Sequence, residues 1–118
     1  MVKEFPPKMQ VQSVQVQCFE MRDKDAFFEM LDRPRFKIGE RSYYNECIRR
    51  HKNGEMDIVL AWTRGEVAGF ALLNWNPKYN YFKKVGLPEI QDLNVLTDYR
   101  RQGIGEKIIR YCEDRATS

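Results

Sequence analysis

Residues that bind metals or form disulfides are scarce in this sequence. It contains one histidine, His51, and three cysteines, Cys18, Cys47 and Cys112. The cysteine count is odd and no pair has Cys-x-x-Cys spacing, which argues against a disulfide framework. One histidine and dispersed cysteines also lack the ligand spacing of a zinc site, so we expect no metal. Each cysteine lies in an apolar pattern, and we expect free, buried thiols in a reducing cytosol.

A Cys–His nucleophile is a weaker interpretation of the same residues. His51 would have to meet a cysteine and a third, orienting group in space. It lies instead near the polar end of a predicted helix.

Long apolar runs are also absent. None approaches the roughly 20 residues that a membrane helix needs, and the first residues do not resemble a signal peptide. The 118 residues suffice for one domain, over 1–118, in which the polar residues 1–12 form a loose arm. The net charge of +3 suits a small anionic ligand but does not argue for nucleic acid. We expect a cytoplasmic protein with no membrane or nucleic-acid partner.

Apolar periodicity predicts an α/β chain in which helices pack on a mixed (α+β) sheet. Asp23 is predicted to cap the first helix, Pro34 to end it, and Asn53-Gly54 to end the second. Arg64-Gly65 is predicted to join two antiparallel strands. The expected order is strand 14–19, a helix from about 23, helix 40–52, strands 57–62, 67–75 and 89–96, and helix 103–116.

A glycine-containing loop, Arg100-Arg101-Gln102-Gly103-Ile104-Gly105, joins the last strand to the last helix. Glycines at a strand-to-helix turn let the backbone approach a ligand closely. The first helical turn has N–H groups without intrahelical partners, and the helix dipole is positive there. These features are typical of a phosphate or pyrophosphate site, although an ordinary helix entry is the alternative.

Two common phosphate loops do not fit. The dinucleotide fingerprint requires a third glycine, but position 108 is Ile. The P-loop of nucleotide triphosphatases requires Gly-Lys-Ser/Thr, but Gly105 is followed by Glu106 and Lys107. The remaining pattern, Arg/Gln-x-x-Gly-x-Gly, is filled by Arg100, Gly103 and Gly105.

This pattern, together with a strand that ends eight residues before Gly103, closely resembles the acyl-CoA loop of the GNAT superfamily of N-acyltransferases. The predicted order of elements resembles the first two thirds of that fold. In the family a strand, a helix and a closing strand pair follow, whereas this sequence stops at Ser118. We therefore interpret the chain as lacking the last third of the domain, and we assign activity to the parent protein.

The resemblance implies that acetyl-CoA is the cosubstrate and that an amine accepts the acetyl group. Backbone N–H groups at about 102–106 would hold the pyrophosphate, and Arg100 or Arg101 would add a charge-assisted contact. The strand would pair with the pantetheine arm, and the N–H of Val95 would donate to the thioester oxygen. The implied cofactor-binding residues are Leu93, Asn94, Val95, Arg100, Arg101, Gln102, Gly103, Ile104, Gly105 and Glu106.

By the same resemblance, a carboxylate near the start of the strand is the general base. Glu89 stands where histone-acetylating relatives carry a glutamate, and Asp92 stands at an often acidic position. We favour Glu89 over Asp92; a structural carboxylate is the alternative for either. The general acid of the family, usually a Tyr, would lie on the absent helix. Aromatic side chains could line the amine side, namely Tyr43, Tyr44, Trp75, Tyr79, Tyr81 and Phe82.

The strand with the candidate base would have an unpaired edge in this chain, and exposed edges recruit partners. We therefore expect self-association. Two alternatives to an enzyme are a CoA-binding module without turnover and a fragment that only interacts with other proteins. The acceptor amine and acyl chain length are not encoded in any motif that we recognise.

Overall fold

The computed structural model describes residues 13–33, 40–75 and 88–117. This part of the chain forms three α-helices, four strands and two short 3-10 helices. No helix there is long and apolar enough to span a membrane. The elements are β1 (Gln15–Cys18), η1 (Met21–Asp23), α2 (Lys24–Leu31), α3 (Arg41–Lys52), β2 (Met56–Thr63), β3 (Glu66–Asn74), β4 (Glu89–Val95), η2 (Thr97–Tyr99) and α5 (Ile104–Thr117).

The four strands form one sheet in the order β1-β2-β3-β4, and every ladder is antiparallel. Arg64 and Gly65 make the turn between β2 and β3, with φ angles of 56° and 78°. Positive φ at both central residues is typical of a two-residue hairpin whose twist matches that of its strands. The predicted α/β class, element order and hairpin are confirmed.

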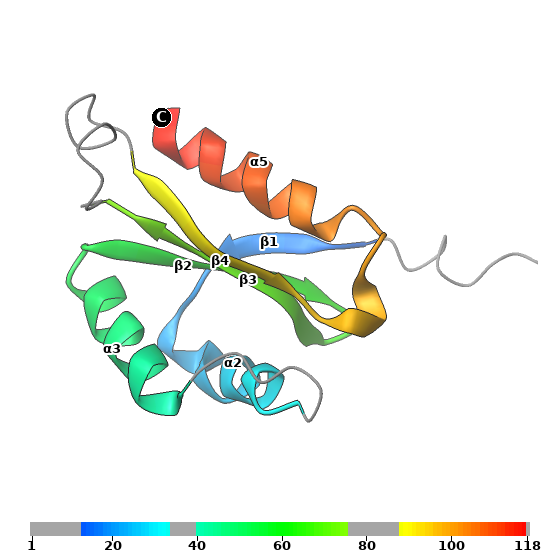
Figure 1. Ribbon diagram of the computed structural model, residues 1–118, viewed down its shortest axis with the longest axis horizontal. Helices are drawn as coiled ribbons and strands as arrows, with labels where there is room; N and C mark the ends of the chain where they lie inside the picture. Colours follow the sequence, from blue (N-terminus) through cyan, green and yellow to red (C-terminus); the bar gives the residue numbers. More distant parts are fainter. Residues whose placement is uncertain (1–12, 34–39, 76–87, 118) are drawn as a thin grey trace, which may run out of the picture.

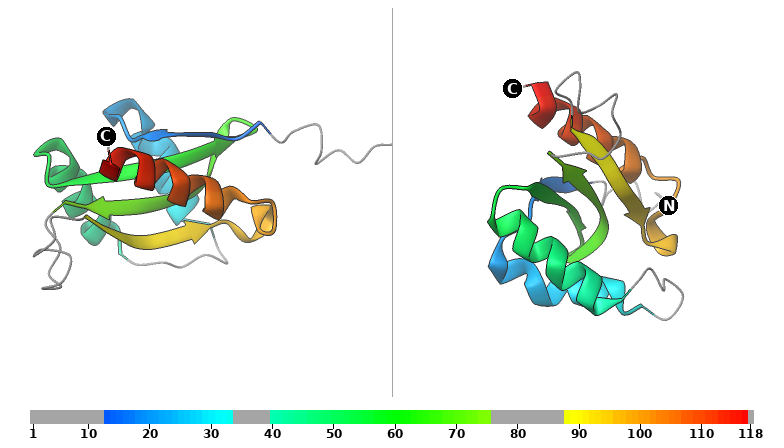
Figure 2. Two further views of the ribbon diagram at one scale, coloured as in Figure 1. Left: turned by 90° about the horizontal axis from the view of Figure 1, so that it is seen from above. Right: turned by 60° about the vertical axis from the view of Figure 1, so that its left-hand side comes forward.

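The sheet lies between two helical layers. In Figure 1, α5 covers one face, and α2 and α3 cover the other; the turned views of Figure 2 show the same arrangement. Phe27 of α2, Tyr44 of α3 and Phe70 of β3 meet edge to face, with ring centroids 5.2 to 5.9 Å apart. On the α5 side, Ile108 and Cys112 are fully buried. The core thus extends through both faces of the sheet.

Helix boundaries follow the predicted signals with one correction. Gly54 has a φ of 79° and its N–H donates to the carbonyl of His51, as expected of a left-handed helix end. The prediction that the Asp23 side chain caps the next helix is wrong, because it makes no cap bond to α2. Its carboxylate instead accepts a hydrogen bond of 2.8 Å from the N–H of Glu20, within the capping box of η1. Pro34 lies outside the described residues.

A β-bulge in β4 is a feature that the sequence analysis did not predict. Phe70 faces Asn94 and Leu72 faces Gln91, so that Asp92 and Leu93 together stand opposite Ala71 alone. Asp92 has a φ of 51°, in the left-handed region, which non-glycine residues seldom adopt.

Gly69 of β3 allows α5 to approach the sheet closely. A Cβ at Gly69 would lie 2.9 Å from the carbonyl O of Asn94, 3.2 Å from Cδ1 of Ile108 and 3.3 Å from Cγ2 of Val95. The first of these atoms belongs to the backbone and cannot rotate away. The packing of β4 and α5 on β3 therefore requires glycine at this position.

We expect Gly69→Ala to lower the free energy of unfolding by about 1–3 kcal/mol, because the added methyl overpacks the junction. Gly105→Ala is the matched control, since its methyl would meet only Val95 and Leu93, at 3.9 and 4.0 Å. That variant should be neutral or slightly stabilising in a helix. Urea unfolding of the three proteins measures both values, and equal midpoints would contradict the role given to Gly69.

Candidate functional site

The loop between η2 and α5 leaves a run of backbone N–H groups without partners. The first helical bond of α5 is donated by Lys107 to the carbonyl of Gly103, 3.1 Å away. Among the described residues, the N–H groups of residues 101–106 find no hydrogen-bond acceptor. They stand at the start of a helix of 14 residues, where its dipole is positive. Such a group of donors can bind an anion.

The two loop glycines differ in what they provide. Gly103 has a φ of 80°, and a Cβ there would meet nothing within 4 Å, so its open side faces empty space. Gly105 faces the side chains of Leu93 and Val95 at ordinary contact distances. Backbone conformation requires glycine at 103, whereas packing among the described residues does not require it at 105.

The charged residues of the loop are exposed. Nε of Arg100 donates to the carbonyl of Val95 at 3.1 Å, which ties the loop to the end of β4. Arg101 has a φ of 66° and is exposed. Nε2 of Gln102 lies 3.5 Å from the carbonyl of Asp98, and Glu106 pairs with Arg110 at 2.9 Å. The loop therefore presents two arginines beside the unpaired N–H groups.

The side chains of β4 point to both faces of the sheet. Val95 and Leu93 approach the start of α5, as the contacts of Gly69 and Gly105 show. Val95 packs against the core, whereas Leu93 is 39% exposed. Asn94 donates to the carbonyl of Asp92 at 3.0 Å. The predicted binding residues Leu93, Asn94 and Val95 thus form the end of β4, from which η2 leads to the loop.

The two candidate carboxylates lie on the α3 side of β4. The hydroxyl of Tyr43 donates to Oδ2 of Asp92 at 3.2 Å. Glu89 faces Asn74 across the ladder, and Arg50 of α3 donates to the Asn74 side chain at 3.2 Å. Residues directly opposite in a ladder share a face of the sheet. Glu89 is half-buried and accepts a bond of 3.1 Å from the side chain of Gln91.

Tyr43, which is exposed, and Tyr44, which is buried, both lie near Asp92. Burial, together with the charge of Asp92, raises the pKa of Tyr44 to about 12. Burial and the neighbouring Cys47 and Asp92 also raise the pKa of Tyr43 above its usual value. Both hydroxyls therefore stay protonated at neutral pH and act as hydrogen-bond donors or neutral acceptors.

The other predicted aromatic residues are only partly described. Tyr43 is 46% exposed and Trp75 is 38% exposed, whereas Tyr44 is buried in the core. The indole N–H of Trp75 donates to Asp57 at 2.9 Å, which draws it to a different carboxylate. Three predicted wall residues lie outside the described part of the chain, namely Tyr79, Tyr81 and Phe82.

The histidine and cysteines do not form a nucleophilic pair. His51 accepts from the N–H of Ile58 at Nδ1, 3.0 Å away, and Nε2 lies 2.8 Å from the carbonyl of Phe19. Both ring nitrogens are therefore engaged in hydrogen bonds with backbone groups. The three cysteines are free thiols; Cys47 and Cys112 are buried, and Cys18 is partly exposed. Burial raises the pKa of Cys112 to about 11, which disfavours the reactive thiolate.

Comparison with known families decides the identity of the fold. The family model described as "Acetyltransferase (GNAT) family" matches residues 17–118. The chain belongs to the GNAT family. This assigns it to the acyl-CoA-dependent N-acetyltransferases in general. Comparison with curated proteins finds no relative by sequence.

Solved structures agree with the GNAT fold at low sequence identity. The aminoglycoside acetyltransferase AAC(6')-Iy, in complex with a CoA bisubstrate analogue, is 11% identical with a TM-score of 0.72, covering 88% of this chain and 71% of its own. A ribosomal-protein-alanine N-acetyltransferase from Brucella melitensis is 22% identical with a TM-score of 0.64, covering 88% and 72%. Glucosamine-6-phosphate N-acetyltransferase from Arabidopsis thaliana is 15% identical with a TM-score of 0.64, covering 89% and 75%.

In this GNAT chain the end of β4 and the glycine loop lie together, as the bond from Arg100 to Val95 shows. The bulge at Asp92 is a feature of β4 that was not predicted. A non-glycine residue held at positive φ costs free energy, and such outliers gather at functional sites. The sequence carries a signal for this bulge. Ile90, Leu93 and Val95 are apolar, so the alternation of the strand is broken by one residue between Ile90 and Leu93.

Proposed function

We propose that the parent protein transfers an acetyl group from acetyl-CoA to a primary amine of a small molecule or protein, in the cytoplasm. The unpaired N–H groups of residues 101–106 at the start of α5 carry this proposal. They supply donors for a diphosphate, and Arg100 and Arg101 add positive charge beside them. The structure of the similar aminoglycoside acetyltransferase with a CoA bisubstrate analogue supports the use of an acyl-CoA.

In this proposal β4 holds the pantetheine arm. The backbone of Leu93, Asn94 and Val95 pairs with the amides of the arm as an added strand would, and one of its N–H groups polarises the thioester carbonyl. No strand of the described residues pairs with the outer edge of β4, which leaves those groups accessible. The amine then approaches from the α3 side, where Tyr43 and Asp92 lie.

The position of the thioester and the choice of base constrain each other. A strand rises about 3.3 Å per residue, so that about 20 Å separates Glu89 from Val95 and about 10 Å separates Asp92 from Val95. Proton transfer needs hydrogen-bond contact, directly or through one water. A thioester at Val95 thus excludes direct action by Glu89. We propose that the reacting carbon lies nearer the bulge, beside Leu93, about 13 Å along the strand from Glu89, and that Glu89 acts through a chain of waters.

The alternative is a CoA-binding module without turnover, because no motif in this chain assigns the general-acid role of the family to one of its residues. Both the enzyme and the binding module should bind acetyl-CoA in a calorimetric titration, whereas a fragment that only interacts with other proteins should not. Release of free CoA in the presence of a panel of amines then separates the enzyme from the module.

We expect Gly103→Glu to weaken acetyl-CoA binding at least about tenfold, because the new carboxylate enters the open side of the loop and repels the diphosphate. Gly54→Glu is the matched control. Gly54 also has a positive φ, 79°, and open space around it, but it follows α3. Titration calorimetry measures both constants. An unchanged dissociation constant for Gly103→Glu would remove the loop from the site.

For the base, we expect Glu89→Gln to lower kcat about 100-fold while the dissociation constant for acetyl-CoA stays the same. Asp92→Asn should instead raise the KM for the amine, because it alters the partner of Tyr43. Steady-state thiol release by the parent protein measures both. A large loss of kcat in Asp92→Asn alone would transfer the role to that residue.

We also propose that this chain self-associates through the outer edge of β4, where Ile90 and Leu93 are 36% and 39% exposed. Light scattering at increasing concentration should give a mass above that of the monomer. Ile90→Lys should restore the monomer, because it places a charge at the edge. Met21→Lys, on a residue 47% exposed in η1, should not. A monomer at every concentration would contradict this proposal.

A further inference from the structure

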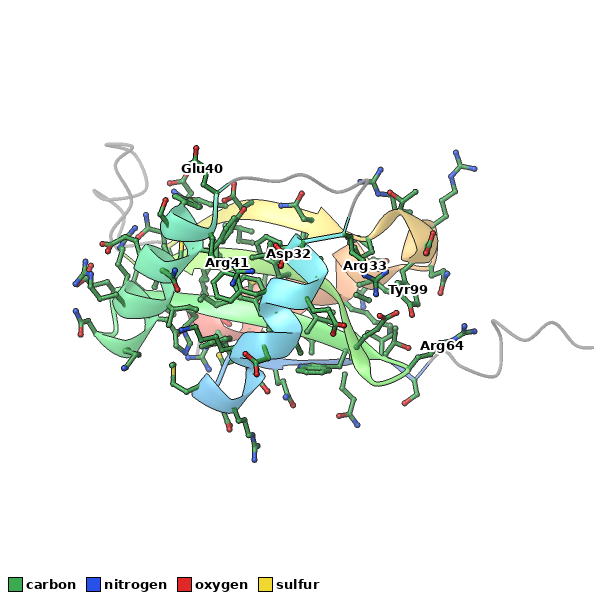
Figure 3. The ribbon with its side chains drawn as sticks, turned by 90° about the horizontal axis from the view of Figure 1, so that it is seen from below. Asp32, Arg33, Glu40, Arg41, Arg64 and Tyr99 are labelled. Carbon is green, nitrogen blue, oxygen red and sulfur yellow. The ribbon has the colours of Figure 1, made fainter. Side chains whose placement is uncertain are left out.

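A carboxylate at the end of the sheet joins two side chains from distant parts of the sequence. Tyr99 of η2 donates its hydroxyl to Oε2 of Glu66, 2.5 Å away. Arg33, which follows α2, donates Nη2 to Oε1 of the same residue. Figure 3 labels Arg33 and Tyr99 and shows them close to each other at one end of the molecule. None of the three belongs to the loop or the candidate base.

The central residue of this group, Glu66, is firmly placed. It is the first residue of β3 and pairs with Thr63 across the two-residue turn of Arg64 and Gly65. Two-residue hairpin turns of this kind fix the register of both strands. The carboxylate therefore extends from a rigid part of the sheet and is a fixed point for its partners.

Tyr99 connects this fixed point to the glycine loop, because Arg100 follows it directly. The side chain is 8% exposed. Burial raises the pKa of the Tyr99 hydroxyl, and the hydrogen bond to Glu66 raises it further. The hydroxyl therefore remains a donor at neutral pH. The N–H of Tyr99 donates to the carbonyl of Leu96, and the N–H of Leu96 donates to the carbonyl of Ala68 in β3. The whole of η2 is thus held against the sheet.

The buried Tyr99 ring is not enclosed on every side. A cavity of about 230 Å³ lies beside it. It is lined by Thr63, Arg64, Asp98, Tyr99 and Gln102. The bond from the Tyr99 hydroxyl to Glu66 therefore acts together with the backbone bonds of η2 in fixing where the following residues lie.

We propose that Tyr99, held by Glu66 and Arg33, is a positioning residue for the diphosphate loop. It touches no ligand; it fixes the direction in which the N–H groups of residues 101–106 point. Binding sites need their donors held to within a fraction of an ångström by supporting side chains. The inference rests on the proposed function, because it assigns a role within that site.

We expect Tyr99→Phe to raise the dissociation constant for CoA about five- to tenfold, which is the size expected for losing one ordinary hydrogen bond. In the parent protein, kcat/KM with acetylpantetheine, which has no diphosphate, should not change. Tyr111→Phe is the matched control, since it removes a hydroxyl that donates to Sγ of Cys18 at 3.5 Å. That variant should leave both quantities unchanged. Circular dichroism establishes that each variant is folded.

A double-mutant cycle tests whether Tyr99 acts through Glu66. Glu66→Ala should weaken CoA binding at least as much as Tyr99→Phe, and the double variant should be no weaker than Glu66→Ala. Additive losses would overturn the inference, as would equal losses with acetylpantetheine. Normal CoA affinity in Tyr99→Phe, beside a loss in Gly103→Glu, would overturn this inference alone. A wild-type chain that binds no CoA would overturn the proposed function as well.

Discussion

The separation between α5 and the sheet is the constraint on which the remaining arrangement depends. Gly69 sets it, because any side chain there would collide with the carbonyl of Asn94 and with Ile108. With no Cβ in the way, α5 settles directly on β3 and β4, and Ile104 in its first turn becomes buried. The unpaired N–H groups of that turn are therefore held where β4 ends. A single small residue in the middle of the sheet thus determines the placement of a loop that lies at its edge.

β4 is the strand on which most of the proposed chemistry depends, and its two faces have different tasks. Leu93 and Val95 contact the start of α5, whereas Glu89 and Asp92 lie on the side of α3. The bulge at Asp92 breaks the regular pairing between these two sets. Bulges bend a strand and turn its backbone groups out of the ladder. Cofactor and acceptor could therefore approach one strand from different directions.

The sequence predicted the elements that depend on local pattern and missed those that depend on distant contacts. Periodicity located the helices and strands, and Asn53-Gly54 marked the left-handed end of a helix. The bulge was missed because a one-residue break in alternation is a weak signal in a short strand. The bond between Tyr99 and Glu66 joins residues 33 apart, for which no local pattern exists. The roles of the predicted site residues remain predictions, because their geometry with a ligand is not encoded in residue order.

His51 has a consequence for experiments on the whole molecule. Because the N–H of Ile58 donates to Nδ1, the proton of the neutral ring must be on Nε2, where it is donated to the carbonyl of Phe19. The ring therefore bridges β2 and the segment that follows β1, while its own backbone belongs to α3. Since it is the sole imidazole of the chain, its nitrogen resonances form an isolated spectroscopic reporter of whether that helix is docked.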